Sequence, residues 1–293
     1  MAAALRDLAE TDVREPIPAT ALLAALQTPP FVLVPGTFNT RDLGLLQPGT
    51  GIRPGFIFRT GGLEALARSA DGQATLREAL HVRRIFDMRS REEHARAADP
   101  ALEGIEGVWL GDEGNGAAEE NPMLDLDLFV DGQGEGGYIA MYMDVLDKYR
   151  GTFREVLASV RDRPDEAIMF HCTAGRDRTG VLAGLLETLA GYDAETVRTD
   201  FLLSRIGTEV AREHLLGFAR KYSKGSAGNG DSSTSFDEAP GFLNLVSLRG
   251  VCWDAFVEAV GMKFGGFEGY AINVLGFSEE DLATIKKNLT ERP

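Results

Sequence analysis

A cysteine and an arginine separated by five residues lie in the stretch HCTAGRDRTG, which runs from His171 to Gly180. The apolar run AIMF at 167–170 is typical of a buried strand, and TGVLAGLLETLA is typical of a buried helix that ends at Gly191. A strand–loop–helix crossing points backbone N–H groups at the helix N-terminus, where the helix dipole adds partial positive charge. The sequence therefore predicts a loop that binds a tetrahedral oxyanion.

The residue types in this loop favour phosphoryl transfer. Helix dipoles and guanidinium groups near Cys172 favour its thiolate, which is a nucleophile at neutral pH. Arg178 can donate two hydrogen bonds to phosphoryl oxygens, and the Thr179 hydroxyl can donate to the sulfur when it leaves. Gly175 and Gly180 permit unusual backbone angles and close approach of the backbone. The predicted chemistry is hydrolysis of a phosphate monoester through a phosphocysteine, with no metal and no other cofactor.

Four residues, His171, Cys172, Arg178 and Thr179, match the His-Cys-x5-Arg-Ser/Thr signature of the cysteine-dependent protein tyrosine phosphatase superfamily. NTRDLG, IRPGFIFRTGGL, IFDMRSREE and the tail FGGFEGYAINVLGFSEEDLATIKKNL resemble the bacterial and fungal tyrosine phosphatase family with an HCxAGKDRTG loop. The resemblance covers about residues 31–293, with gaps at 111–137 and 223–248.

This resemblance implies a protein tyrosine phosphatase-like α/β fold, in which helices flank a central sheet and a helical lid covers the site. The segment 196–222 is the candidate for the lid. Members of the family act on phosphotyrosine, phosphoserine or phosphothreonine, and phosphoinositides. We therefore expect a phosphorylated protein or a phosphoinositide as the partner, with protein phosphotyrosine first. The residues expected to bind the phosphoryl group are Thr173, Ala174, Gly175, Arg176, Asp177 and Arg178.

Two carboxylic acids are candidates for the group that protonates the leaving oxygen. Asp177 lies inside the loop, where the resemblance implies a catalytic role. Asp87 lies near the carboxyl end of a predicted strand, VRRIFDMRS at 82–90, and the sites of α/β proteins lie at such strand ends. The sequence favours Asp177 slightly and leaves both candidates open.

Two further loop residues carry specific expectations. Arg176 stands where the family has lysine, and it offers a bidentate fork in place of a point charge. We expect activity to survive this difference, with an altered preference for multiply phosphorylated substrates. His171 is expected to hold the loop through a hydrogen bond. Arg176 and the open question of the acid leave one alternative, a non-catalytic module that binds phosphorylated ligands on the same fold.

The elements around the loop indicate a helical lead-in at 1–30 followed by a phosphatase domain at 31–293. Strands and helices alternate along the chain, which favours a sheet with helices packed on it. The expected strands are 31–34, 55–61, 82–90, 107–110 and 167–170, and the expected helices lie within 63–80, 91–98, 138–160, 179–190, 193–222 and 249–293. The acidic, Gly-rich stretch 111–137 is expected to be a long loop and 223–241 a flexible linker.

The composition narrows the partners and the compartment. The 45 acidic residues outnumber the 30 basic ones, which argues against nucleic acid as a partner. Only Cys172 and Cys252 carry thiols, which favours a reducing compartment, and we expect the cytoplasm. The N-terminus lacks the apolar run of a signal peptide. No run reaches the roughly 18–20 apolar residues of a membrane span, so no integral membrane association is expected.

Overall fold

The computed structural model describes residues 2–111, 124–221, 223–224 and 239–292. Its central sheet has five strands in the order β1 (Arg41–Asp42), β2 (Ile57–Thr60), β6 (Ala167–His171), β3 (Val82–Asp87) and β4 (Glu106–Val108). The strand β1 runs antiparallel to β2, and the other neighbouring strands are parallel. A separate parallel pair consists of β5 (Leu124–Asp125) and β7 (Ser223–Lys224).

Helices account for most of the remaining described chain. They are α1 (Ala2–Ala9), α2 (Ala19–Leu26), α3 (Ala70–Ala74), α4 (Arg91–Arg96), α6 (Glu135–Lys148), α7 (Arg150–Asp162), α8 (Asp177–Leu189), α9 (Ala194–Gly207), α10 (Arg212–Lys221), α11 (Phe242–Val246), α12 (Gly250–Phe264), α13 (Gly266–Asn273) and α14 (Glu279–Thr290). None of these helices, within the described residues, is long and apolar enough to cross a membrane.

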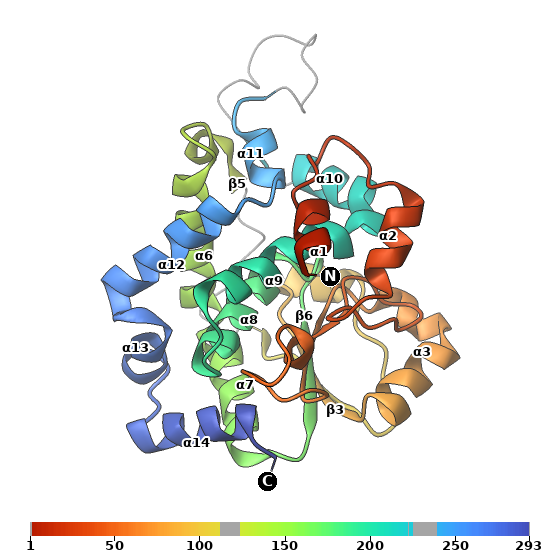
Figure 1. Ribbon diagram of the computed structural model, residues 1–293, viewed down its shortest axis with the longest axis vertical. Helices are drawn as coiled ribbons and strands as arrows, with labels where there is room; N and C mark the ends of the chain where they lie inside the picture. The colour runs from red at the N-terminus through yellow and green to blue at the C-terminus, as the bar shows by residue number, and fades with distance from the viewer. Residues whose placement is uncertain (1, 112–123, 222, 225–238, 293) are drawn as a thin grey trace.

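The strand β6 shows why the sheet is covered on both faces. Its residues alternate between two hydrophobic clusters, because successive side chains of a strand point to opposite faces. Ile168 and Phe170 join the larger cluster with α7 and α8, whereas Ala167 and Met169 join the smaller one with the chain around α3. Figure 1 shows β6 and β3 between α7 and α8 on one side and α3 on the other. This arrangement confirms the predicted α/β fold, a central sheet flanked by helices.

Two of the predicted elements differ in the structure. The segment 31–34 is not a strand: Phe31 makes a single bridge to Arg41, and prolines flank the segment on both sides. Prolines lack the N–H that a ladder of strand hydrogen bonds needs. The predicted helix at 138–160 is two helices, α6 and α7, because Tyr149 leaves the helical conformation with φ −102° and ψ 20°. Apolar spacing alone did not reveal this break, since buried positions continue on both sides of it.

Two of the predicted irregular segments are partly regular. The expected loop 111–137 contains β5, a 3-10 helix at Leu126–Phe129 and the start of α6, while residues 112–123 lie outside the described residues. The expected linker 223–241 contains β7, and its residues 225–238 also lie outside the described part. The buried side chains of Leu126 and Phe129 pack into the larger cluster, which the acidic composition of the stretch concealed.

The segment 196–222, expected as a lid, divides into two parts. Its first part is α9, most of which is buried against α1, α8 and α12, so this helix belongs to the core. Its second part, a short 3-10 helix at Glu209–Ala211 followed by α10, is less buried and ends beside the Cys172 loop. A lid function for this second part remains a prediction.

Candidate active site

The loop between β6 and α8 is held in place through its backbone carbonyl groups. Asn39 donates from Nδ2 to the carbonyl oxygens of Ala174, at 3.1 Å, and Gly175, at 2.9 Å. Arg59 donates from Nη2 to the carbonyls of Gly175, at 2.8 Å, and Arg176, at 3.3 Å. The N–H of a trans peptide points away from its C=O. Because Asn39 and Arg59 hold these carbonyls on one side of the loop, the N–H groups of the same peptides point to the other side. An anion-binding loop requires this orientation.

A buried ion network fixes the two residues that hold the loop. Asp200 of α9 accepts from Arg41 Nε at 2.7 Å and from Arg59 Nη1, and Arg41 Nη1 also donates to the Asn39 side chain. All three charged side chains are fully buried. Burial by itself would raise the pKa of Asp200, but the two guanidinium groups lower it to about 2. Buried charges of this kind are tolerated only when they are paired, so the network specifies one position for the loop.

Gly175 packs closely against the end of β2. Its φ is +63°, a conformation that side chains rarely adopt. A Cβ atom at this position would lie 2.2 Å from the carbonyl oxygen of Thr60, at the end of β2. Backbone strain and a backbone contact therefore both require glycine here.

Replacing Gly175 with alanine is expected to destabilise the fold by about 3 kcal/mol or more, because strain adds to a contact that cannot relax. Gly191 is the matched control, since its φ is +86° and no atom lies within 4 Å of an added Cβ. Gly191→Ala introduces backbone strain without a steric contact. It is expected to lower the free energy of unfolding by about 1 kcal/mol. Urea unfolding of both variants measures the difference. Equal losses would contradict the role assigned to the Thr60 contact.

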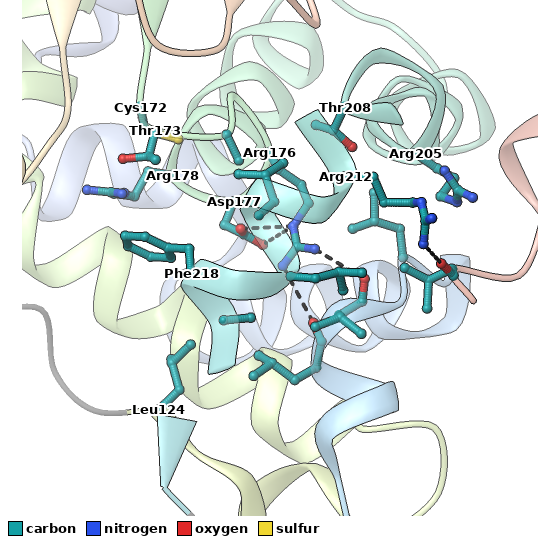
Figure 2. Close-up of a pocket in the computed structure, with 18 of the residues that line it drawn as sticks. Leu124, Cys172, Thr173, Arg176, Asp177, Arg178, Arg205, Thr208, Arg212 and Phe218 are labelled. Carbon is teal, nitrogen blue, oxygen red and sulfur yellow. Dashed lines mark hydrogen bonds and ion pairs between the residues drawn. The ribbon is translucent and has the colours of Figure 1, made fainter. Parts of the chain in front are cut away.

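The predicted nucleophile lies at the base of a pocket. Cys172 is 2% exposed and lines this pocket together with Thr173, Ala174, Arg176, Asp177 and Arg178. The opposite walls come from α10, with Arg212, Leu216 and Phe218, and from α11 and the residues after it, with Leu245, Val246 and Leu248. Figure 2 shows the loop side chains, Phe218 of α10 and Leu124 of β5 around this space. The loop residues expected to bind a phosphoryl group, with the exception of Gly175, thus share one pocket wall.

Arg178 is held in place by a carboxylate that the sequence analysis did not single out. Glu93 accepts from Arg178 Nη1 at 2.6 Å and from Nη2 at 2.8 Å, and the Met88 carbonyl accepts from Nη1 at 2.9 Å. The guanidinium also lies over the ring of Tyr149, 5.8 Å from its centroid. Nη2 carries two N–H groups, and Glu93 accepts from one of them. Among the described residues, Nε has no hydrogen-bond acceptor. The Nε–Nη2 edge is therefore available for bidentate binding of a phosphoryl group.

Glu93 itself is fixed by local and distant contacts. It forms a capping box with Ser90 at the start of α4, and it accepts a hydrogen bond from the Thr173 hydroxyl. Burial would raise its pKa, but the Arg178 guanidinium and these hydrogen bonds lower it to about 2. The Ser-x-x-Glu spacing in the sequence predicts a helix start. It does not predict that the same carboxylate orients Arg178, 85 positions further along the chain.

The two candidate acids lie in different surroundings. Asp177, the first residue of α8, lines the pocket and accepts from the Tyr142 hydroxyl at 2.8 Å and from Arg176 Nε at 2.9 Å. Asp87 is buried and does not line this pocket; it accepts from Arg89 Nε and from His94 Nδ1, at 2.9 and 2.8 Å. Although burial would raise the pKa of Asp87, His171 and Arg89 hold it well below its usual range. The geometry thus favours Asp177 for proton donation to a substrate in the pocket.

The remaining candidate residues flank the loop. The Thr179 hydroxyl is buried, and it has no hydrogen-bond partner among the described residues, so it is free to donate when a charge forms nearby. His171 is fully buried, with Nδ1 3.3 Å from the carbonyl oxygen of Cys172 and Nε2 2.7 Å from Asp99. Gly180 lies inside α8 and faces Arg59 and Phe201, where a small residue allows close packing.

A parallel strand, a Cys-x5-Arg loop with inward amides and a helix N-terminus together define a loop of the type that cysteine phosphatases use for phosphate esters. The profile of the tyrosine phosphatase family matches residues 32–291, and the chain belongs to this family. It is therefore an enzyme, a phosphoric monoester hydrolase.

Two relatives illustrate the relationship. A tyrosine-protein phosphatase from Nostoc commune is 27% identical over 224 residues, which cover 76% of this chain and 71% of the relative. The triple specificity protein phosphatase PtpB from Mycobacterium tuberculosis is 29% identical over 206 residues, which cover 62% of this chain and 72% of the relative.

Proposed function

We propose that this phosphatase hydrolyses phosphate monoesters in two steps through a phosphocysteine. In the first step the Cys172 thiolate attacks phosphorus, the bond from phosphorus to the leaving oxygen breaks, and Asp177 gives its proton to that oxygen. The loop amides and the Nε–Nη2 edge of Arg178 bind the phosphoryl oxygens as charge spreads over them. Arg178 is held for this task by Glu93.

In the second step a water molecule attacks the phosphocysteine. The ionised Asp177 takes a proton from this water, the sulfur–phosphorus bond breaks, and inorganic phosphate leaves. The sulfur regains its negative charge and accepts a hydrogen bond from the Thr179 hydroxyl, which has no other partner among the described residues. Neither step requires a metal, since the guanidinium and the amides supply the positive charge.

The observation that carries this proposal is the position of the loop. Cys172, Asp177 and Arg178 line one pocket, and the loop carbonyls are held away from it by Asn39 and Arg59. A phosphoryl group in this pocket would meet the nucleophile, the acid and the guanidinium together.

For the substrate we propose protein phosphotyrosine first, with phosphoserine, phosphothreonine and phosphoinositides as further candidates. The wall opposite the loop carries apolar side chains, among them Leu216 and Leu248, which suit an aromatic ring. Arg176 is engaged by Asp177 and by the carbonyl of Val246, at 3.2 Å, which leaves it poorly placed to bind a second phosphate. The name of the first relative, a tyrosine-protein phosphatase, supports phosphotyrosine as a candidate, and that of the second, a triple specificity protein phosphatase, supports more than one substrate class.

For the compartment we propose the cytoplasm. Cys172 and Cys252 are both free thiols, which suits a reducing environment. The rest of the phosphatase proposal does not depend on this assignment.

A substrate panel tests the function. Phosphate release is measured from an aryl phosphate, from phosphotyrosine, phosphoserine and phosphothreonine peptides, and from phosphoinositides, each with a chelator present. We expect release from the aryl phosphate and the phosphotyrosine peptide at rates that the chelator does not change. Release only from phosphoinositides would contradict the proposed order of substrates, and loss of activity with the chelator would contradict the metal-free mechanism.

A further inference from the structure

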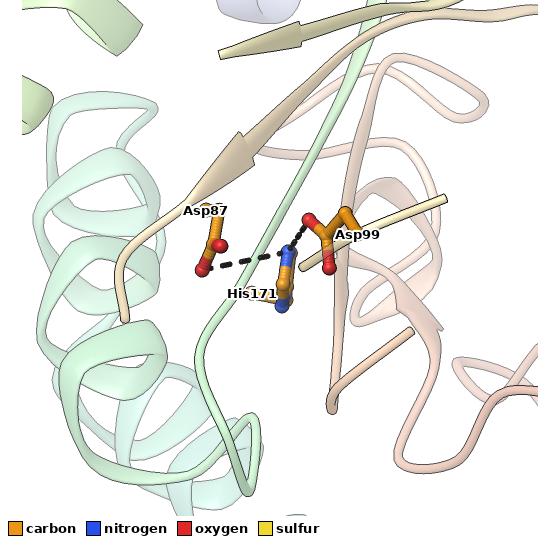
Figure 3. A group of neighbouring side chains, drawn as sticks. All are labelled: Asp87, Asp99 and His171. Carbon is orange, nitrogen blue, oxygen red and sulfur yellow. Dashed lines mark hydrogen bonds and ion pairs between the residues drawn. The ribbon is translucent and has the colours of Figure 1, made fainter. Parts of the chain in front are cut away.

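A histidine and two aspartates meet next to the loop, and none of the three lines the pocket that contains Cys172. Figure 3 shows His171 between Asp87 and Asp99, with dashed lines to both. His171 Nε2 lies 2.7 Å from Asp99 Oδ2 and 3.8 Å from Asp87 Oδ1. Its Nδ1 lies 3.3 Å from the carbonyl oxygen of Cys172. Both ring nitrogens therefore face oxygen acceptors, and an imidazole satisfies two acceptors only when both nitrogens carry protons.

These three side chains also have the spacing of a metal site, but their other contacts disfavour a cation. Arg89 donates from Nη2 to Asp87, at 2.9 Å, and to Asp99, at 2.7 Å. A guanidinium thus already binds the two carboxylates that a metal would need. When His171 is protonated, the carboxylates of Asp87 and Asp99 are balanced by the positive charges of Arg89 and His171. This balance of charge favours the imidazolium.

The two aspartates divide their contacts differently. Asp87 accepts from the backbone and side chain of Arg89 and from His94 Nδ1. These hydrogen bonds connect Asp87 to the residues that follow β3. Asp99 uses Oδ1 for Arg89 and Oδ2 for His171. The hydrogen-bonded ion pair of His171 is therefore with Asp99, and Asp87 acts on the ring across a longer distance.

We propose that Asp99 is a positioning residue for the phosphatase reaction, which keeps His171 as an imidazolium against the backbone carbonyl of Cys172. A positive charge on the residue that precedes Cys172 in the chain favours the thiolate that attacks phosphorus. Asp99 acts through His171 and touches neither the substrate nor the sulfur. The proposal rests on the proposed function, in which Cys172 is the nucleophile.

The electrostatics of the cluster agree with this geometry. Burial lowers the pKa of His171, but the carboxylates of Asp87 and Asp99 outweigh burial and the opposing charge of Arg89, and they raise the pKa to about 9. The ring therefore carries its charge across the neutral range, in which the nucleophile must be ionised.

Asp99→Asn tests the charge while retaining an oxygen that can accept from His171 Nε2. The measurement is the rate of alkylation of Cys172 by iodoacetamide as a function of pH, in a Cys252→Ser background. We expect the midpoint of this curve to rise by about one pH unit in the variant, because the imidazolium of His171 is stabilised less when Asp99 loses its charge. The acidic limb of kcat/KM is expected to move in the same direction.

Glu64→Gln is the matched control. Glu64 accepts from Arg89 Nη1 at 2.7 Å, as Asp99 accepts from Nη2, but it makes no hydrogen bond with His171. This variant loses one ion pair of Arg89 and is expected to keep the alkylation midpoint of the parent protein. Coincident midpoints for Asp99→Asn and Glu64→Gln would overturn the proposal, as would an activity loss in Asp99→Asn without any midpoint shift.

Thermal unfolding of each variant is recorded in parallel. If Asp99→Asn does not fold, His171→Gln removes the same charge, and an unchanged alkylation midpoint in that variant would overturn the proposal. Failure of the proposed function has a different signature, because Cys172→Ser would then retain turnover whatever Asp99 does. The two results can therefore be separated.

Discussion

Replacing Cys172 with serine is expected to lower kcat by about 10⁴-fold or more for each substrate that the enzyme hydrolyses. A serine hydroxyl at this position is not ionised near neutral pH, and it is a much weaker nucleophile than a thiolate. In the proposed mechanism Asp177 serves the leaving oxygen, and His171 faces the Cys172 carbonyl and Asp99. The loop amides and Arg178 remain, so substrate binding is expected to survive. Steady-state kinetics with an aryl phosphate separates kcat from KM.

Cys252→Ser is the matched control for this substitution. Cys252 is the other free thiol, it is fully buried on α12, and it does not line the pocket. Its replacement is expected to leave kcat within about twofold of the parent protein, since an exchange of sulfur for oxygen in the core acts mainly on stability. Wild-type turnover by Cys172→Ser would refute the phosphocysteine and would point to direct attack of water.

The sequence predicted the loop because its parts are contiguous. A strand, a glycine-containing turn and a helix within 167–190 determine the anion site locally, and the structure places Cys172, Asp177 and Arg178 in one pocket. The strands β2, β3 and β6 were predictable for a similar reason, because each carries its own apolar pattern, whereas β1 (Arg41–Asp42) carries none. Agreement was poorest where apolar spacing continues through a break in the backbone conformation, as at Tyr149 between α6 and α7.

The residues that position the loop could not be predicted in this way. Glu93, Asn39 and Asp99 were not singled out in the sequence analysis. Each reaches the loop through the tertiary fold, and their hydrogen bonds span 72 to 136 positions of the chain. One sequence contains no signal for such separations. The resemblance in NTRDLG and IFDMRSREE marked the stretches that contain Asn39 and Glu93 without revealing what those residues touch.

The second large expected effect is the loss of kcat when the proposed general acid is replaced. Asp177→Asn is expected to lower kcat by about 10²–10⁴-fold for a phosphoserine or phosphotyrosine peptide, whose leaving oxygen needs a proton. For 4-nitrophenyl phosphate the expected loss is about tenfold or less, because a nitrophenolate leaves without protonation and the acid contributes little. The ratio of the two rates, measured for the parent protein and the variant, is the readout.

Asp87→Asn provides the comparison that separates the two candidate acids. Asp87 accepts from Arg89 and His94 and does not line the pocket, so its loss is expected to act on the folded structure around β3. Such a change slows good and poor leaving groups alike and leaves their ratio unchanged, because no proton transfer to substrate is lost. A ratio that changes in Asp87→Asn and stays constant in Asp177→Asn would assign the acid to Asp87. Pocket geometry would then have to change on substrate binding, since the described structure separates Asp87 from the pocket that contains Cys172.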